Sequence, residues 1–319
     1  MSRTAKRILI IVLGIVVVGC IALYGVIEHV LPYSVIMPHR ITHTEIVNAV
    51  HGDPTPELFG LHAEQFDITV DDSISLKGWF IHADSTSPGG TVVILHGLSS
   101  CKEALFPTAR TFVRAGFNCI LYDMRAHGVS GGQYCTFGYY EKRDLSRYID
   151  SVLTRFGSVT GPVAVMGGSL GAAVALQAME ADPRICCGVV ESPFATLREI
   201  VFDYMKRRTG FSARWVSDLA LTRAGEIARF PVDSVRPEES ARHITQPVMV
   251  VHGLQDVHIS PEYGKRVFQN LRTSDKEWVP IAQAAHFNIA SVGGEAYRKK
   301  IVDFLRQHMR EYGQRRVSD

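Results

Sequence analysis

Five short, continuous apolar runs constrain the fold of this chain most. They are TVVILHG, NCILYDMR, PVAVMGGS, CCGVVESPF and PVMVVHG, and glycine, proline or polar residues bound each one. Runs of this kind are typical of strands that are buried on both faces of a sheet. Segments of helical period separate them, so strands alternate with helices along the chain. The pattern predicts an α/β fold with a mainly parallel central sheet, right-handed crossovers and helices on both faces.

Two other regions add to this predicted sheet. Within residues 64–81, EQFDITV and SISLKGWFI alternate apolar and polar residues, which predicts a half-exposed antiparallel edge. Residues 195–245 contain no strand-like run but carry apolar residues at helical spacing. We interpret this interval as a small helical cap inserted before the next strand. Ordinary helical packing of the domain is the alternative.

The N-terminal region is the most apolar part of the chain. Residues 8–27 form an uncharged stretch rich in Ile, Val and Leu, which matches the length of a membrane-spanning helix. Arg3, Lys6 and Arg7 precede it, so the positive-inside bias predicts a single-pass cell-membrane anchor with the rest of the chain extracytoplasmic, in the periplasm of a Gram-negative cell. A cleaved signal peptide and a lipid-modified Cys20, in the lipobox-like sequence VVGC, are the alternatives.

These features divide the chain into five parts. We expect a cytoplasmic N-terminus (1–7), a transmembrane helix (8–27), a connector (28–61), a globular domain (62–312) with the cap at 195–245, and a C-terminal tail (313–319). His39 and His43 fall in the connector, beside Pro38, and are interpreted as solvated.

Composition excludes several classes of function. The formal charge of +2 and the short basic runs at 206–208 and 299–300 argue against a nucleic-acid partner. No C-x-x-C, H-E-x-x-H or paired Cys/His spacing occurs, so the sequence predicts no metal site and no cofactor.

The six cysteines form no disulfide framework. Cys101 and Cys135 both follow predicted strands, and a bridge between them stays open if the domain is extracytoplasmic. We expect Cys186 and Cys187 to be small apolar core residues.

Ser169 lies where one of the apolar runs meets an alanine-rich, helix-favouring segment. The stretch GPVAVMGGSLGAA contains the pattern G-x-S-x-G, and a strand, a sharp turn and a helix are what a nucleophile elbow requires. A serine nucleophile needs a general base, an acid that orients this base, and donors for the oxyanion. Asp256 follows a predicted buried strand, and His286 lies in the loop after the next one. The order serine, acid, histidine is that of the α/β-hydrolases.

Other polar residues at strand ends are alternatives for these roles. Glu191 ends the run GVVES and is an alternative acid. His258 is too close to Asp256 in sequence to reach the serine easily, so we expect it to pack in the loop. Hydrogen bonds that fix loops are the expected role of three further residues, namely His96, Asp123 and His127.

Successive motifs extend this likeness along the chain. LHGLSS, YDMRAHGVSGG, MGGSLGA, ESPF, HGLQDVHISPE and AAHFN resemble, in content and order, the motifs of α/β-hydrolases of the serine aminopeptidase and monoacylglycerol lipase type. The resemblance covers roughly residues 62–312. Ala126 stands for the usual glycine of RGHG, and Ala285 for a glycine common before the catalytic histidine. Neither change removes a functional group, so they bear on loop geometry.

The resemblance implies a role for each site residue. Ser169 matches the nucleophile, Asp256 the acid and His286 the base, and the backbone N–H groups of Leu98 and Leu170 match the oxyanion donors. It implies a membrane-anchored serine hydrolase that cleaves small-molecule acyl esters, thioesters or lipid-like substrates through an acyl-enzyme.

Two further hypotheses stay open. One is an aminopeptidase in which Glu199 or Asp203 holds the substrate ammonium; the other is a catalytically silent, anchored binding protein. The cap favours esters in our interpretation, because aromatic residues suit an acyl pocket. These residues are Phe202, Tyr204, Phe211 and Trp215.

Overall fold

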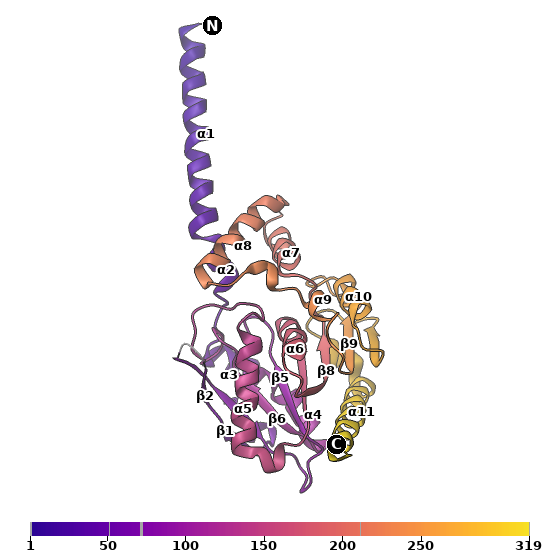
Figure 1. The fold of residues 1–319 in the computed structure, drawn as a ribbon. Coiled ribbons are helices and arrows are strands. Elements are labelled where there is room, and N and C mark those ends of the chain that lie inside the picture. The colour runs from indigo at the N-terminus through magenta and orange to yellow at the C-terminus, as the bar shows by residue number, and fades with distance from the viewer. Residues whose placement is uncertain (1, 51, 71–72, 211, 319) are drawn as a thin grey trace.

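An eight-stranded sheet forms the centre of the domain (Figure 1). The structure is a computed structural model that describes residues 2–50, 52–70, 73–210 and 212–318. The strand order is β1-β4-β6-β5-β7-β8-β9-β10. The bounds are β1 (Ala63–Gln65), β4 (Gly78–Ile81), β5 (Thr91–Leu95), β6 (Asn118–Tyr122), β7 (Val163–Gly168), β8 (Ile185–Glu191), β9 (Val248–Gly253) and β10 (Lys276–Ile281).

The pairing of these strands confirms the predicted sheet. From β6 to β10 every neighbouring pair is parallel, and β4 and β1 add an antiparallel edge. The two alternating runs each break into two short strands. Their inner halves, β2 (Ile68–Val70) and β3 (Ile74–Leu76), pair with each other in a separate two-stranded sheet.

Helices cover both faces of the sheet and divide the core in two. One core lies under α5 (Glu141–Thr160), α6 (Leu170–Ala181) and α10 (Pro261–Asn270) and includes Tyr148 and Val174. The other lies under α4 (Phe106–Arg114) and α11 (Ile289–Ser318) and includes Phe112 and Leu305. The central strands are buried on both faces, which is why their sequences are continuously apolar.

The cap is the helical insertion between β8 and β9. It contains α7 (Leu197–Thr209), α8 (Arg214–Ala228), the short 3₁₀ turn η4 (Val232–Ser234) and α9 (Pro237–Ser240). In Figure 1, α7 and α8 lie above the sheet, between it and the N-terminal helix.

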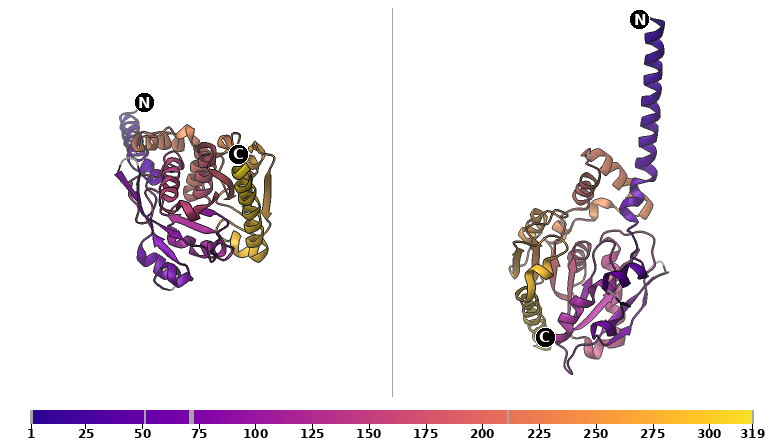
Figure 2. Two further views of the ribbon diagram at one scale, coloured as in Figure 1. Left: turned by 60° about the horizontal axis from the view of Figure 1, so that its bottom comes forward. Right: turned by 180° about the vertical axis from the view of Figure 1, so that it is seen from behind.

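The N-terminal helix α1 (Arg3–His29) extends away from the domain in every view (Figures 1 and 2). Together with α2 (Leu31–Ile36) it is the one helix, among the described residues, that is long and apolar enough to cross a membrane, and only 6% of its most apolar window is buried. A signal sequence near the N-terminus can meet the same criteria of length and hydropathy, so the cell-membrane location and the orientation stay predictions.

The segment predicted as a connector is more ordered than its sequence indicated. It contains α2, α3 (His43–Val50) and the 3₁₀ turn η1 (Pro56–Phe59). Ile36 is fully buried, and its carbonyl accepts a 2.8 Å hydrogen bond from the Cys135 N–H. The Arg40 guanidinium donates to the carbonyls of Gly128 and Ser130, at 3.1 and 2.6 Å, and also to those of His127 and Gly132. The sequence did not indicate this order, because the helices are too short to show a sustained apolar period. A single residue, Arg40, makes many of the hydrogen bonds that attach the segment to the domain.

All six cysteines are free, so the bridge considered between Cys101 and Cys135 is wrong. Both are fully buried in separate places, Cys101 before the 3₁₀ turn η3 (Lys102–Leu105) and Cys135 against Ile36. Cys186 and Cys187 are buried in the core, as predicted.

Candidate active site

Ser169 lies at the turn between β7 and α6 with a φ of 56° and a ψ of −117°. Residues other than glycine rarely adopt positive φ, and such strain is concentrated at functional sites. The turn is held by the Ser169 N–H, which donates to the Glu191 carbonyl at 2.8 Å. A Cβ at Gly167 would lie 2.3 Å from the Gly171 oxygen, and one at Gly171 would lie 2.3 Å from the Leu95 oxygen. Only glycine therefore fits at positions 167 and 171, two residues before and two residues after the serine.

Asp256 and His286 meet at the C-terminal ends of β9 and β10. The His286 Nδ1 lies 2.7 Å from the Asp256 Oδ2, and both side chains are almost fully buried. The other carboxylate oxygen accepts the backbone N–H groups of His258 and Ile259, at 2.8 and 2.9 Å. A carboxylate held in this way fixes the imidazole so that Nδ1 donates and Nε2 is left to accept a proton.

The environment of Asp256 keeps it ionised. Burial acts to raise its pKa, but hydrogen bonds from His252, His286 and the Ile259 N–H outweigh burial and hold the pKa well below its usual range. His252 is fully buried, lies 3.5 Å from the Asp256 Oδ2 and contacts the Ile259 carbonyl at 3.0 Å. Sequence analysis assigned no role to His252, although its position before Gly253, at the end of a buried strand, matches that of His96 in the motif LHGLSS.

Glu191, the alternative acid, has a different partner. Its carboxylate accepts a hydrogen bond from the Tyr297 hydroxyl of α11, a residue that sequence analysis did not single out. Burial raises the pKa of Glu191, although Tyr297 and the nearby His286 act to lower it. Among the described contacts, the acid hydrogen-bonded to His286 is Asp256.

The two predicted oxyanion donors lie beside the serine. Leu170 is the first residue of α6, so its N–H has no acceptor within the helix. Leu98 follows Gly97, where an added Cβ would lie 3.7 Å from the Ser169 Cβ. Both amides are therefore near the position where an attacked carbonyl would lie, and their role stays a prediction.

The other polar residues at this edge fix loops. Asp123 is fully buried, pairs with the Lys102 ammonium at 2.9 Å and accepts the Lys102 and Val129 N–H groups. The His96 Nε2 accepts the Met124 N–H at 3.0 Å, and burial lowers the pKa of His96 to about 4. These contacts agree with the loop-fixing role that we expected of both residues.

A pocket of about 470 Å³ borders the candidate acid. It lies between α7 and the loop after β9. Its lining residues are Asp203, Lys206, Arg207, Asp256, Val257, His258 and Ser260. The His258 ring stacks on His286, with ring centroids 5.4 Å apart, and burial together with Arg207 and His286 lowers the pKa of His258. Val257 and Phe287 are strongly exposed and add an apolar rim.

The cap aromatics do not form the acyl pocket that we expected from them. Trp215 is 54% exposed and is absent from the lining of the pocket. Phe202 and Tyr204 each lie under an arginine, Arg214 and Arg207 respectively. Phe211 lies outside the described residues.

The two carboxylates considered for an ammonium differ in their surroundings. Glu199 is bound by the Arg266 guanidinium at 2.7 and 3.2 Å and by the Thr196 hydroxyl at 2.7 Å. Asp203 accepts the Tyr263 hydroxyl at 2.5 Å and lines the pocket. Of the two, Asp203 is therefore the one placed to meet a substrate.

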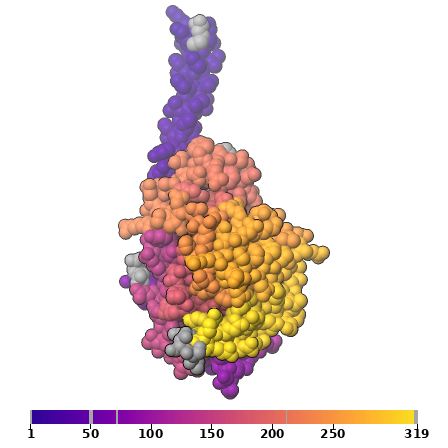
Figure 3. All heavy atoms as spheres, turned by 45° about the vertical axis from the view of Figure 1, so that its right-hand side comes forward, coloured from indigo at the N-terminus to yellow at the C-terminus, as the bar shows by residue number. Residues whose placement is uncertain are grey.

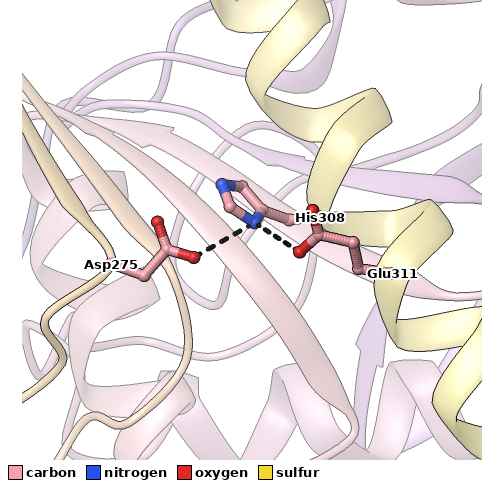
Figure 4. A group of neighbouring side chains, drawn as sticks. All are labelled: Asp275, His308 and Glu311. Carbon is pink, nitrogen blue, oxygen red and sulfur yellow. Dashed lines mark ion pairs between the residues drawn. The ribbon is translucent and has the colours of Figure 1, made fainter.

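A second cluster of charged residues lies at the opposite end of the sheet (Figure 4). Asp275, before β10, lies 3.4 Å from the His308 Nδ1, and Glu311, one turn along α11, lies 3.6 Å from it. Both carboxylates are about half exposed. Ion pairing accounts for this arrangement, and we assign no metal to it.

Comparison with known proteins places this geometry in a family. The family model for serine aminopeptidases (S33) matches residues 86–230. The esterase Pf2001 of Pyrococcus furiosus has a TM-score of 0.70 and 25% identity, covering 87% of this chain and 98% of that one. The chain has the α/β-hydrolase fold, and its middle part matches the serine aminopeptidase family.

Two curated relatives are similar in sequence to most of this chain. The uncharacterized protein YqkD of Bacillus subtilis (strain 168) is 25% identical over 253 residues, which are 72% of this chain and 75% of that protein. The α/β hydrolase domain-containing protein WAV2 of Arabidopsis thaliana is 23% identical over 306 residues, 93% of each chain. The predicted fold and the predicted resemblance to α/β-hydrolases are therefore confirmed, and this likeness supports hydrolase activity.

Proposed function

We propose that this α/β-hydrolase is a membrane-anchored serine hydrolase that cleaves carboxylic esters or thioesters. The observation that carries the proposal is the 2.7 Å contact between His286 and Asp256, at the same edge of the sheet as the strained Ser169. A serine or a histidine that acted alone would not need a buried carboxylate hydrogen-bonded to the histidine at the same edge of the sheet. The fold of the Pyrococcus furiosus esterase, which this chain resembles, supports the choice of esters.

The reaction follows from these groups. The Ser169 Oγ attacks the acyl carbon while His286 Nε2 takes the hydroxyl proton, and Asp256 stabilises the imidazolium that forms. The N–H groups of Leu98 and Leu170 donate to the developing oxyanion. His286 then gives the proton to the departing alkoxide or thiolate, which leaves an acyl-Ser169. Water, deprotonated by His286, releases the acid and restores the serine.

An aminopeptidase-type amide hydrolase is the second candidate. The match to the serine aminopeptidase model favours it, and Asp203 in the pocket supplies a carboxylate for a substrate ammonium. A neutral ester needs no such charge. The two candidates therefore differ in their response to Asp203→Asn, which should weaken amide turnover and leave ester turnover largely unchanged.

A substrate panel tests the proposal. Purified full-length protein in detergent is assayed with chromogenic esters of increasing acyl length beside aminoacyl amides, with Ser169→Ala as the control for contaminating activity. We expect Ser169-dependent ester hydrolysis. Turnover of amides alone would favour the second candidate, and no turnover together with no labelling by a fluorophosphonate would favour the silent binding protein.

Anchoring is tested on cells. The α1 helix predicts that the protein fractionates with membranes and resists extraction by high salt. With the expected orientation, protease added to intact cells, after any outer membrane is opened, digests the domain. Full protection of the domain would contradict the orientation and leave the hydrolase proposal standing.

A further inference from the structure

The outer surface of the cap carries apolar side chains where polar ones are usual. On α8, Trp215 is 54% exposed and Leu219 is 51% exposed. Residues four apart lie on the same face of a helix. Farther along the same face, Thr222 and Glu226 are exposed. The exposed stripe of α8 is therefore apolar in its N-terminal half and polar in its C-terminal half.

The apolar half of this stripe belongs to the end of α8 that is nearer to α7. In Figure 1 and in the right-hand view of Figure 2, the α7–α8 turn reaches the level of the lower end of α1 and lies to one side of it. Figure 3 shows the cap between α1 and the rest of the domain. The C-terminal half of α8 is attached to this span, since α8 packs against α1 and α2 and the Arg223 Nε lies 3.4 Å from the Glu28 Oε2. The attachment fixes the height of Trp215 relative to α1.

Cations surround the same turn. Residues 206–214 contain four basic residues and no acidic one. In the described part of the chain, Lys206 and Arg208 make no salt bridge, and Arg214 approaches an acid only at 4.0 Å, where it meets Asp218. A mixture of exposed aromatic and basic side chains is typical of surfaces that lie at the membrane interface.

The apolar surface continues from the cap to the span. At α2, which packs against α8, Tyr33 is 38% exposed, and the flanking residues Val30 and Met37 are 56% and 44% exposed. Tyr24, in the lower part of α1, is 64% exposed. Tyrosines at this level suit the headgroup region, where their ring is in apolar surroundings and their hydroxyl is hydrated.

We propose that this cap outer face, formed by Trp215, Leu219 and the cations of residues 206–214, rests in the headgroup region of a lipid bilayer. The inference rests on the anchoring by α1 proposed above, because the same bilayer is the occupant. Trp215 and Leu219 contact the acyl boundary, and the cations contact anionic headgroups. Lys206 and Arg207 also line the pocket beside Asp256, so the candidate active site opens next to this surface. Its substrates are then amphiphilic acyl esters that reach it from the bilayer.

The three tryptophans of the chain allow a direct test. The full-length Trp79→Phe/Trp278→Phe variant keeps Trp215 alone, and the matched Trp215→Phe/Trp278→Phe variant keeps Trp79, whose indole nitrogen is buried. Both are reconstituted in phosphatidylcholine and phosphatidylglycerol vesicles that contain lipids brominated near the headgroup. We expect bromine to quench Trp215 and not Trp79. Should a double variant fail to fold, the difference in quenching between the wild type and Trp215→Phe gives the same result.

The charges are tested separately. Arg208→Glu should reduce the quenching of Trp215 in vesicles with phosphatidylglycerol and change it little in phosphatidylcholine alone, because repulsion requires an anionic surface. Arg110→Glu, at an exposed position of α4, is the control and should change neither. Equal effects of the two substitutions would contradict the role of the cap cations.

Each outcome bears on one proposal. Unquenched Trp215 in a protein that floats with the vesicles and hydrolyses a water-soluble ester overturns this inference and leaves the proposed function standing. Quenching of Trp79 as strongly as Trp215 also overturns it, because no specific face is then selected. A protein that does not float with vesicles overturns the anchoring, and this inference with it, while Ser169-dependent hydrolysis is scored independently.

Discussion

The sheet domain and the cap use the same residue types in opposite ways. In the sheet domain, the charged residues near the site are buried and paired, as Arg125 is with Asp144 and Lys102 with Asp123. In the cap, Trp215 and Leu219 are exposed, and among the described cations of residues 206–214 Lys206 and Arg208 make no salt bridge. The domain thus satisfies its polar groups internally, whereas the cap leaves apolar and charged groups for something outside the chain.

Because of this difference, substitutions in the two regions should have different effects on activity and stability. Substitutions of buried residues in the sheet domain should change chemistry or stability, because every neighbour of these residues is part of the protein. Substitutions on the outer cap should change neither in a water-soluble assay. The following predictions test this separation.

Ser169→Ala should have the largest effect on activity. It removes the attacking oxygen, and because catalytic residues act as a unit, we expect a loss of ~10³-fold or more in kcat. Labelling by a fluorophosphonate should disappear, while circular dichroism stays that of the wild type. Trp215→Ser, assayed with the same soluble ester, should lose less than ~3-fold, in line with the small effects usual for surface positions. Labelling of a folded Ser169→Ala protein would show that another residue is the nucleophile.

Asp256→Asn should cost somewhat less. The imidazole remains, but it loses the carboxylate that orients it and stabilises its charge, so we expect a loss of ~10²- to 10⁴-fold in kcat. Glu191→Gln keeps an acceptor for Tyr297 and should stay within a few-fold of the wild type. The reverse ranking in kcat measurements would assign the acid role to Glu191.

Phe112→Ala should destabilise the domain. Phe112 is fully buried under α4, and truncating a buried phenylalanine costs ~3–5 kcal/mol in the free energy of unfolding. Leu219→Ala, on the exposed face of α8, should change it by less than ~0.5 kcal/mol. Thermal unfolding in detergent compares the two. A similar loss for Leu219→Ala would show that the cap face is covered by the protein itself.

The two buried carboxyls should respond oppositely to pH. The pKa of Asp256 is lowered in the folded state, so its stabilising contribution is present above about pH 4 and is lost as pH falls further. The pKa of Glu191 is raised, so the folded state loses stability as pH rises through its unfolded value of about 4.3. Glu191→Gln should therefore gain in Tm relative to the wild type between pH 4 and pH 8. A constant difference across this range would contradict the raised pKa.

Sequence was most informative where local pattern and tertiary role coincide. Buried strands have continuous apolar sequences, and the tight turn at Ser169 requires small residues at Gly167 and Gly171, so both leave a signature in the residues themselves. Tyr297 leaves none, because its contact with Glu191 comes from a strand and a helix that meet only in the folded chain.

In the cap, the sequence predicted the helices but not which of their side chains face outward. Helical spacing indicated its helices, but the side on which Trp215 lies depends on how α8 packs against α1 and α2. The aromatic residues were therefore assigned to a pocket, whereas Trp215 lies on the outside. The short helices of the predicted connector escaped notice for a similar reason, since Ile36 and Arg40 acquire their partners only from loops about 90 residues away.

Arg40 donates hydrogen bonds to the carbonyls of Gly128 and Ser130 and so attaches the segment after α2 to the domain. The free length of chain between α1 and the domain is therefore short. A long, flexible linker would let the candidate active site move through a deep layer of solution. In the membrane-anchored enzyme that we propose, this attachment restricts the candidate site to a thin layer at a nearly constant height above the bilayer. In that layer the rate at which the enzyme encounters its substrate depends on the number of substrate molecules per unit area of membrane. Diluting the surrounding solution at fixed lipid composition would leave this encounter rate almost unchanged.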